Sequence, residues 1–236
     1  MKVIGFIFAA GFGTRLKPYT NSKPKALVKI DGKTLIDNAI NKLVENGIKN
    51  IIVNVHHFSD LIIKHIRNNN YDAKIFISDE RAYLRETAGG LKFAIPFWDN
   101  YDAILLYNVD ILSNINLRQL IDFHFHNAND ATLAVRNRET SRYFIFNDDN
   151  LLCGWCNKQD AEEKIVRKST TYKYLAFSGI HLINRDLAKE INSVEKSSIT
   201  NYYLEKAHNK NIRAYIHNLD LWEDIGKFET FKDRLS

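Results

Sequence analysis

The order of apolar runs and amphipathic stretches constrains the fold of this chain most strongly. Residues 3–8 form an apolar run that is typical of a buried strand, and residues 35–44 space their apolar side chains as a helix does. The two patterns then alternate, which predicts further strands at 51–55, 74–78 and 102–107 and further helices at 60–67, 87–95 and 116–127. This βαβαβαβ order predicts an α/β fold with a doubly wound, mostly parallel sheet and helices on both faces.

Four residues mark the expected ends of these helices. Thr34 and Ser59 are expected to be N-caps, because a hydroxyl can accept a hydrogen bond from the first turn. Gly47 follows the last apolar residue of its helix, where a left-handed backbone commonly ends the helix. Pro96 is expected to end the helix at 87–95, since proline lacks the N–H that a continuing helix needs.

The second half of the chain has a different pattern, which predicts a β-rich lobe. A turn at 148–150 lies between two short apolar runs and predicts a hairpin. The expected strands are 131–136, 144–147, 151–156, 175–183 and 212–217, and the expected helices are 184–191 and 198–209. No linker rich in Gly, Pro or Ser interrupts the chain, so we expect one domain over 1–236, with the lobe at 129–236 packed over the ligand end of the sheet formed by 1–128.

Composition narrows the class of protein further. Net charge is +5, but the basic residues are dispersed, so nucleic-acid binding is not indicated and an anionic, phosphorylated substrate explains the surplus equally well. No apolar run reaches the length of a membrane span, and the first residues lack a signal-peptide pattern. Cys153 and Cys156 are expected to be buried thiols in a reducing compartment. We therefore expect a cytoplasmic protein, a monomer or small homo-oligomer, without a membrane partner.

The segment that follows the first strand carries the clearest chemical signal. Gly11 and Gly13 lie one residue apart and are followed by Thr14 and Arg15. A glycine turn can present consecutive N–H groups to an anion, and an arginine can clamp phosphate oxygens. The dinucleotide-binding glycine motif is excluded, since Leu16 occupies its third glycine position, and no P-loop lysine follows. We interpret this segment as a grip for a polyphosphate, with Lys25 ten residues beyond Arg15.

Two aspartates are candidates for a metal site. Asp110 follows the predicted strand at 102–107, at the same edge of the sheet as the glycine segment. Asp224 lies between Trp222 and the pair Ile225-Gly226, in a context typical of a partly buried turn. Because Mg²⁺ prefers carboxylate oxygens and keeps several waters, we expect these two side chains to hold one Mg²⁺.

Five motifs in order along the chain resemble those of the nucleotidyltransferases that join a nucleoside triphosphate to a sugar 1-phosphate. The similarity is closest to N-acetylmuramate-1-phosphate uridylyltransferases and to heptose- or mannose-1-phosphate guanylyltransferases. The motifs are Gly-Phe-Gly-Thr-Arg-Leu at 11–16 with Pro-Lys-Ala-Leu at 24–27, Glu-Thr-Ala-Gly-Gly at 86–90, Asn-Val-Asp-Ile at 108–111, Phe-Ser-Gly-Ile at 177–180, and Trp-Glu-Asp-Ile-Gly-Lys at 222–227.

The resemblance implies a Rossmann-like nucleotidyltransferase fold, a nucleotide-binding part at 1–128 and a sugar-binding lobe at 129–236. It also implies an activity, in which an NTP and a sugar 1-phosphate give an NDP-sugar and pyrophosphate with Mg²⁺. Carried over residue by residue, the implied catalytic residues are Arg15, Lys25 and Asp110; the nucleotide-binding residues are Ala10, Gly11, Gly13, Thr14, Arg15, Gly89, Gly90 and Asn108; the sugar-binding residues are Glu86, Thr87, Ser178 and Gly179; and the metal ligands are Asp110 and Asp224.

Three departures from the family pattern leave the base and the sugar open. Val109 replaces a glycine and is expected either to crowd the ribose or to shift the loop, and Lys227 replaces a common threonine. The family's Glu-Lys-Pro motif for the sugar phosphate is absent, and either Lys158 or Lys164 is expected to substitute for it. Two other functions stay open: a phosphocholine-type cytidylyltransferase, whose relatives share Pro-Lys-Ala-Leu, and a non-catalytic nucleotide-sensing module.

Two further pairs of side chains each have a functional and a structural interpretation. His56 and His57 could touch the base or ribose, although paired loop histidines are more often structural. Arg81 and Arg85 are equally compatible with surface charges and phosphate contacts. His124 lies on a helix at a spacing that does not share a face with His126, so it is expected to be structural.

Overall fold

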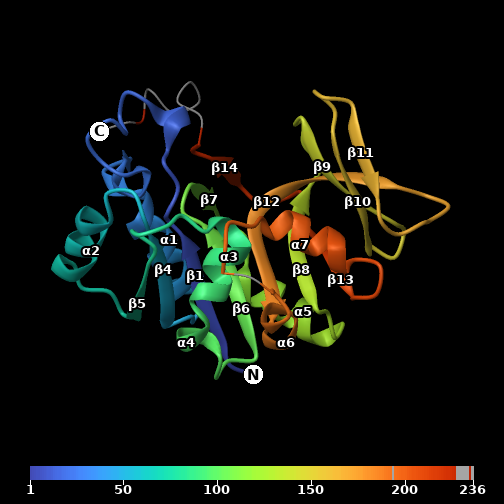
Figure 1. Cartoon of the computed structure of the whole chain (residues 1–236), viewed down its shortest axis with the longest axis horizontal. Coiled ribbons are helices and arrows are strands. Elements are labelled where there is room, and N and C mark those ends of the chain that lie inside the picture. The colour runs from blue at the N-terminus through green and yellow to red at the C-terminus, as the bar shows by residue number, and fades with distance from the viewer. Residues whose placement is uncertain (193, 227–233, 235–236) are drawn as a thin grey trace.

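Four parallel strands form one part of a ten-stranded mixed sheet among the described residues, and we call these four the central sheet (Figure 1). The computed structural model describes residues 1–192, 194–226 and 234. The order across the sheet is β6, β1, β4 and β5, and all three neighbouring pairs are parallel. Their bounds are Val3–Phe8 for β1, Asn50–Val55 for β4, Lys74–Asp79 for β5 and Ala103–Asn108 for β6. These four strands confirm the strands predicted in the first half of the chain.

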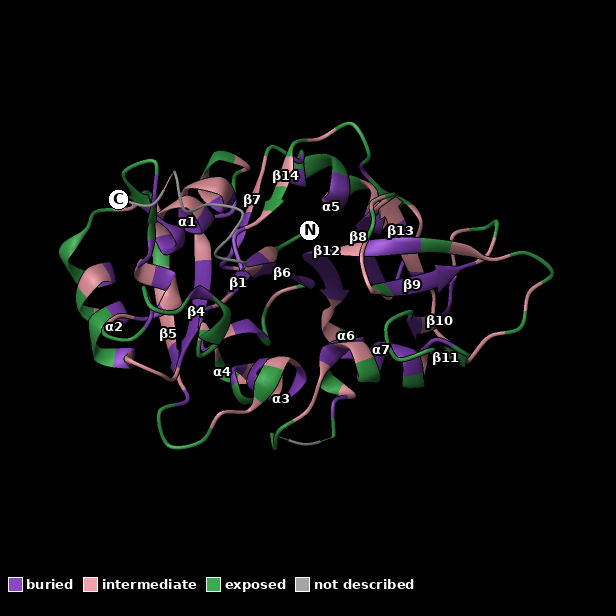
Figure 2. Cartoon of the chain, turned by 90° about the horizontal axis from the view of Figure 1, so that it is seen from above, coloured by how far each residue is buried: buried purple, intermediate pink, exposed green. Residues whose placement is uncertain are grey.

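Helices cover both faces of this sheet, as Figure 2 shows from above. One buried cluster packs Ile7 of β1 against apolar residues of the helices α1 (Leu35–Glu45), α2 (Ser59–Asn68) and α5 (Leu117–His126). A second cluster packs Phe6 of β1 against the other face, with α3 (Glu86–Phe93), α4 (Ile95–Trp98), α6 (Arg185–Lys189) and α7 (Ile199–Lys206). Adjacent residues of one strand thus serve two cores, and the predicted doubly wound α/β fold is confirmed.

One long strand, β12 (Lys173–Asn184), joins the central sheet to the β-rich lobe. Its end at residues 180–184 pairs antiparallel with β6, and its start at 173–175 pairs antiparallel with β9. The register shifts between Phe177 and His181, which marks a bulge in the strand. The remaining strands are β8 (Ala131–Arg136), β9 (Arg142–Phe146), β10 (Leu152–Asn157), β11 (Glu162–Ile165) and β13 (Ile212–Ile216). The predicted hairpin forms between β9 and β10.

Short elements that the sequence pattern did not predict complete the fold. Strand β7 (Ile111–Ser113) pairs antiparallel with β14 (Trp222–Asp224). The two-residue strands β2 (Lys29–Ile30) and β3 (Lys33–Thr34) form a small hairpin. Two 3₁₀ turns lie at Thr14–Leu16 and Lys25–Leu27. Strands of two or three residues carry too little periodicity to be read from a sequence.

The expected helix ends are partly confirmed. Thr34 caps α1, since its side chain accepts a hydrogen bond from the Asp37 N–H, and Gly47 follows α1 with φ of 85°. Ser59 is not a cap: α2 begins at Ser59, and the cap position is Phe58, at φ 54° and without a side-chain hydrogen bond. Pro96 does not end a helix either. Pro96 lies at the start of α4. A backbone N–H at that position would have no partner within the helix, so its absence costs no hydrogen bond.

The two cysteines are buried thiols, as expected. Cys153 and Cys156 are buried and free, and burial raises the pKa of both thiols. In the described part of the chain, no helix is both long enough and apolar enough to cross a membrane.

Two histidines are buried beside the central sheet. His181 lies on β12 with its Nδ1 2.7 Å from the Tyr203 hydroxyl, and His124 lies on α5 with its Nδ1 2.9 Å from the Thr132 hydroxyl. Burial lowers the pKa of His181 to about 3 and that of His124 to about 4. His124 is therefore structural, as expected.

These histidines should make folding stability fall in acid. The folded protein keeps them neutral, whereas the unfolded chain takes up protons below about pH 6.5, so the unfolding free energy drops as pH falls from about 6.5 toward 4. His181→Asn should reduce that slope by about 1.4 kcal/mol per pH unit, because one titrating group is removed. Urea unfolding at several pH values measures the slope. The control is His126→Asn at an exposed position on the same helix as His124; an unchanged slope in His181→Asn would contradict the prediction.

Candidate active site

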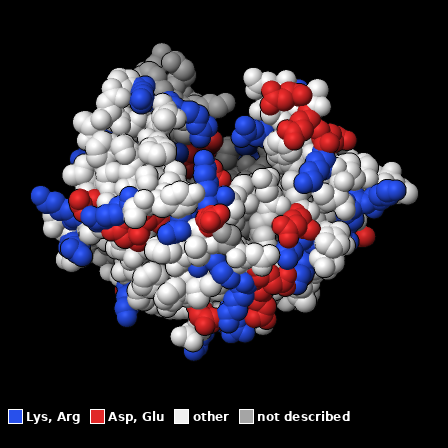
Figure 3. Space-filling model, in the orientation of Figure 1, with Lys and Arg blue, Asp and Glu red and all other residues white. Residues whose placement is uncertain are grey.

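The carboxyl ends of the central strands are level and form one edge of the sheet. Phe8 at the end of β1 is in register with Asn54 of β4 and with Asn108 of β6. Ligands of such sheets bind beyond this edge. Figure 3 shows a hollow at the top of the molecule, with acidic and basic side chains along its walls, and Figure 1 shows β14 and the β-rich lobe beside it.

The glycine segment leaves β1 and turns back on itself at this edge. Gly13 has φ of 65°, and a Cβ there would lie 2.9 Å from the Cβ of Lys25. The Thr20 hydroxyl donates to the Gly13 carbonyl over 2.9 Å, and Leu16 is buried. Only glycine can therefore occupy position 13, and the turn at Gly13 packs closely against the segment that carries Lys25. Gly11 differs from Gly13. It is exposed, and a Cβ at Gly11 would have no contacting protein atom within 4 Å.

A buried polar network holds the start of this segment. Asn54 accepts a hydrogen bond from the Ala9 N–H over 2.8 Å and donates to Glu80 over 2.8 Å, and Glu80 accepts from the Arg85 N–H over 3.2 Å. Burial raises the pKa of the Glu80 carboxyl. The network ties together the ends of β1, β4 and β5 and the start of α3. The sequence analysis did not predict this network, because its only sign in the sequence is a polar residue at each strand end.

The two aspartates meet through the pairing of β7 with β14. Asp224 is in register with Ile111, the residue after Asp110, and the Ile225 N–H donates to the Asp110 carbonyl over 2.8 Å. Asp110 is almost fully buried, and its carboxylate forms an ion pair with the ammonium of Lys25. The pairing thus brings together two predicted metal ligands that lie far apart in the sequence.

Gly226 marks the point where the predicted catalytic side chains converge. A Cβ at Gly226 would lie 2.7 Å from Oδ1 of Asp224, 2.8 Å from Nη2 of Arg15 and 3.0 Å from Oδ2 of Asp110. Three charged groups therefore surround one position, and any larger residue would push them apart. Arg15, Lys25, Asp110 and Asp224 form one cluster, as the sequence analysis expected of them.

The donors in this cluster suit a magnesium ion. Asp110, just before β7, and Asp224, at the end of β14, offer carboxylate oxygens where the two strands pair, and Mg²⁺ is commonly held by one or two carboxylates together with phosphate oxygens and water. Within the described residues, no three His, Cys, Asp or Glu side chains are grouped so as to hold a metal by themselves. The two carboxylates would thus hold the ion jointly with a phosphate ligand.

The start of α3 contacts the start of α7 and the segment that precedes it. The Thr87 hydroxyl accepts a hydrogen bond from the Ile199 N–H over 2.8 Å, so this predicted sugar contact is already engaged within the protein. Glu86 is half-exposed at φ 59° and forms an ion pair with Lys196 over 3.4 Å. Glu86 therefore keeps an accessible carboxylate near the edge of the sheet.

The two glycines of α3 are buried, and packing explains their identity. A Cβ at Gly89 would lie 2.1 Å from the Glu195 carbonyl oxygen, and one at Gly90 would lie 2.7 Å from Oε1 of Glu80. Their predicted contact with a nucleoside stays a prediction. Ala10 is buried, Thr14 is exposed, and Asn108 is half-buried at the end of β6.

Ser178, which is predicted to border the sugar, lies inside the protein, and its contact with a sugar stays a prediction. Its side chain is fully buried, and its hydroxyl lies 2.6 Å from Nε2 of His217, whose Nδ1 is 3.5 Å from Asp220. Burial lowers the pKa of His217 to about 4. In this structure the hydroxyl is therefore engaged within the protein and has no exposed surface. The Ser178 carbonyl accepts a hydrogen bond from the Trp222 indole over 2.8 Å and so supports β14.

Gly179 and Val109 lie beside Asn108. Gly179 has φ of 72°, and a Cβ there would lie 2.8 Å from Nδ2 of Asn108, so the bulge of β12 packs directly on the end of β6. Val109 is buried in the core beside α1, so its side chain does not crowd the ligand edge. The other departure from the family pattern, Lys227, lies outside the described residues.

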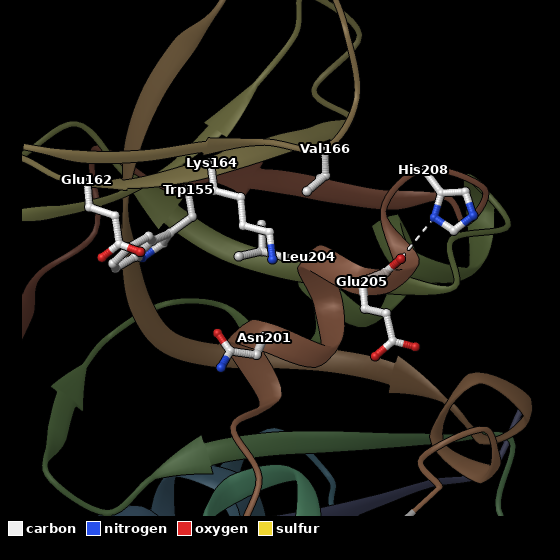
Figure 4. A pocket seen from close by; sticks show the side chains of 8 residues that line it. All are labelled: Trp155, Glu162, Lys164, Val166, Asn201, Leu204, Glu205 and His208. Carbon is white, nitrogen blue, oxygen red and sulfur yellow. Dashed lines mark hydrogen bonds between the residues drawn. The ribbon is translucent and has the colours of Figure 1, made fainter.

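Lys164 and Lys158, the candidates for the missing sugar-phosphate lysine, lie on different surfaces of the lobe. Lys164 lines a pocket of about 700 Å³ between the β10–β11 hairpin and α7, together with Trp155, Glu162 and Glu205 (Figure 4). Its ammonium points into that pocket toward Leu204. Lys158 lies over the ring of Tyr143, 4.7 Å from the ring centre. Neither residue belongs to the cluster around Gly226.

The remaining candidates take partners within the protein. Arg81 pairs with Asp79 and Asp60, and Arg85 donates to the Val194 carbonyl over 2.6 Å. The exposed ring of Phe12, in the glycine segment, lies against His56 and His57 with centroid distances of 5.5 and 5.4 Å.

Comparison with known proteins agrees with this geometry. The model of the family described as nucleotidyl transferase matches residues 4–235. N-acetylmuramate alpha-1-phosphate uridylyltransferase from Caulobacter vibrioides is 45% identical over 95 residues, which are 39% of this chain and 39% of that protein. Mannose-1-phosphate guanyltransferase from Hypocrea jecorina is 26% identical over an alignment of 239 positions, which covers 96% of this chain and 62% of that protein. The chain thus spans less than two thirds of the length of these relatives.

Solved structures support the fold. The crystal structure of HddC from Yersinia pseudotuberculosis is 20% identical and superposes with a TM-score of 0.80, covering 99% of this chain and 98% of that one. A second structure of HddC, complexed with GMP-PN, gives a TM-score of 0.79. The match of the family model over nearly the whole chain, on a fold that carries its motifs at one sheet edge, shows that the chain belongs to the nucleotidyl transferase family.

Proposed function

We propose that this protein transfers a nucleotidyl group from an NTP to a sugar 1-phosphate, which yields an NDP-sugar and pyrophosphate. The observation that carries the proposal is the cluster of Arg15, Lys25, Asp110 and Asp224 around Gly226. The family of the chain and the sugar-1-phosphate activities named for its relatives from Caulobacter vibrioides and Hypocrea jecorina support the same reaction.

The glycine segment is suited to bind the triphosphate. Gly11 is open to solvent at the end of β1, so a phosphate can approach its backbone closely. Arg15 reaches the cluster from the same segment and can bind phosphate oxygens with two N–H groups. The fixed position of the turn, held by Thr20 and Lys25, means that little reorganisation is needed on binding.

Lys25 would change partners during the reaction. Without substrate its ammonium pairs with Asp110. Bound to Asp110 and Asp224, Mg²⁺ would offset negative charge on the phosphates. Lys25 can turn from Asp110 toward the α-phosphate, where its ammonium would stabilise the charge that develops in the transition state.

The reaction needs no general base, because the nucleophile is an anion. A phosphate oxygen of the sugar 1-phosphate forms a bond to the α-phosphorus, while the bond from that phosphorus to the bridging oxygen breaks and pyrophosphate leaves with the electron pair. The protein contributes position and electrostatics. This is consistent with the burial of Ser178 and His217, which are withdrawn from the hollow.

A screen of the four NTPs against several sugar 1-phosphates tests the proposal. We expect pyrophosphate release with at least one pair, with mannose 1-phosphate and N-acetylmuramate α-1-phosphate as the first acceptors, and a loss of about a hundredfold or more in Asp110→Asn and Asp224→Asn. Phosphocholine with CTP is included as an acceptor. Activity only with phosphocholine would favour a cytidylyltransferase, and NTP binding without any turnover would favour a nucleotide-sensing module.

Lys25→Ala and Arg15→Ala should have different kinetic signatures. Lys25→Ala should lower kcat by about a hundredfold or more and leave NTP binding nearly unchanged, because the lysine acts mainly in the transition state. Arg15→Ala should weaken NTP binding and turnover together, because a triphosphate clamp acts in both states. Steady-state kinetics and calorimetry with an unreactive NTP analogue measure the two effects. A Lys25→Ala variant with normal kcat and weakened NTP binding would reduce Lys25 to a binding contact.

Gly11→Ala should weaken NTP binding without loss of stability. A Cβ at Gly11 meets no protein atom, so the melting temperature should stay the same, while the methyl group would stand where a phosphate approaches and should weaken NTP binding by about tenfold or more. The matched control is Gly32→Ala, whose φ of 82° makes alanine strained and should cost about 1 kcal/mol of stability without affecting NTP. Equal NTP affinity in Gly11→Ala and wild type would remove Gly11 from the phosphate site.

A further inference from the structure

Arg138 is a charged residue near the cluster that neither the motifs nor the family comparison assigns. It follows β8 in the segment that leads to β9, and it is half-buried. Its guanidinium lies over the ring of Trp222, 4.5 Å from the ring centre, and donates to the Phe177 carbonyl over 3.2 Å. Arg138 is thus held between β14 and the bulge of β12.

The position of Arg138 relative to Asp224 follows from strand geometry. Trp222 and Asp224 are two residues apart in β14, so their side chains project from the same face of that strand. A guanidinium stacked on Trp222 therefore stands on the side of β14 that bears the Asp224 carboxylate. The charge interaction between the two groups agrees with this, since burial lowers the pKa of Arg138 and Asp224 acts in the opposite direction.

The guanidinium is only partly engaged. The guanidinium donates hydrogen bonds to two backbone carbonyls, over 3.2 Å to Phe177 and 3.4 Å to Glu139, and its Nε is buried without a partner. Among the described residues, no carboxylate lies within 4.0 Å of it, whereas Arg15, Lys25 and the aspartates compensate one another. A half-buried cation held on an aromatic ring, with Asp224 near it but no carboxylate in direct contact, is suited to bind an anionic ligand.

Given the proposed function, the direction of the reaction indicates which anionic ligand Arg138 binds. Pyrophosphate must leave toward the glycine segment, where the β- and γ-phosphates are held, and an in-line displacement requires the nucleophile to enter from the opposite side of the α-phosphorus. The strand order β12, β6, β1 places β6, which ends two residues before Asp110, between β1 and β12, and Arg138 is held on β12 through the Phe177 carbonyl. We propose that Arg138 binds the phosphate of the sugar 1-phosphate and so takes the place of the absent Glu-Lys-Pro lysine.

Kinetics with both substrates test the role of Arg138. Using the acceptor with the highest rate in the screen, Arg138→Gln should raise KM for the sugar 1-phosphate by about tenfold or more and change KM for the NTP by less than about twofold. Arg138→Lys should be intermediate, because it keeps the charge but loses the two-pronged hydrogen bonding. Calorimetry with an unreactive NTP analogue should give wild-type affinity for both variants.

The matched control is Arg136→Gln. Arg136 also lies over Trp222, at 5.8 Å, but it donates to the carbonyls of Asp220 and Asn218, so its loss should leave both KM values unchanged. An unchanged KM for the sugar 1-phosphate in Arg138→Gln, or an equal rise in both KM values, would overturn the proposal. If Arg138→Gln unfolds, Arg138→Lys decides by the same split of KM values. No turnover in the wild type with any acceptor would instead overturn the proposed function.

Discussion

Two carboxylates at one edge of a sheet repel each other, and the site depends on how that repulsion is offset. Asp110 and Asp224 are brought together by strand pairing, and the cations that neutralise them come from a third segment, through Lys25 and Arg15. Gly226 gives these groups the room to meet. In the proposed reaction the same groups would exchange these partners for a phosphate or a cation, so the charges of the cluster would stay compensated with and without substrate.

The sequence predicted the features that depend on local pattern. The four parallel strands, the helices on both faces and the hairpin at 148–150 follow from periodicity and turn residues, and they agree with the structure apart from element ends. Arg15, Lys25 and the two aspartates could be placed because each follows a recognisable strand or motif. The pairing of β7 with β14, which joins them, could not be predicted, since three-residue strands are too short to show alternation.

Other parts of the site could not be predicted because they depend on tertiary contacts. Asn54 and Glu80 are polar residues at strand ends, which usually suggest exposure, yet they are buried because each satisfies the other. Ser178 and Thr87 belong to motifs associated with ligands, but their hydroxyls hold together segments of the protein. Arg138 has no motif around it at all. A motif therefore locates a region of the chain more reliably than it assigns the contact made by each side chain.

The pairing of β14 with β7 also has a consequence for the order of folding. Most of the second half of the sequence separates Trp222 from its pairing partner Ser113, and the pairing covers only three residues on each strand. Closing so long a loop has an entropic cost that so few backbone hydrogen bonds cannot offset until β8, β12 and β13 have already shortened the path. We therefore expect the cluster around Gly226 to be among the last contacts to form, so that a chain with a complete sheet and core can still hold Asp224 apart from Asp110.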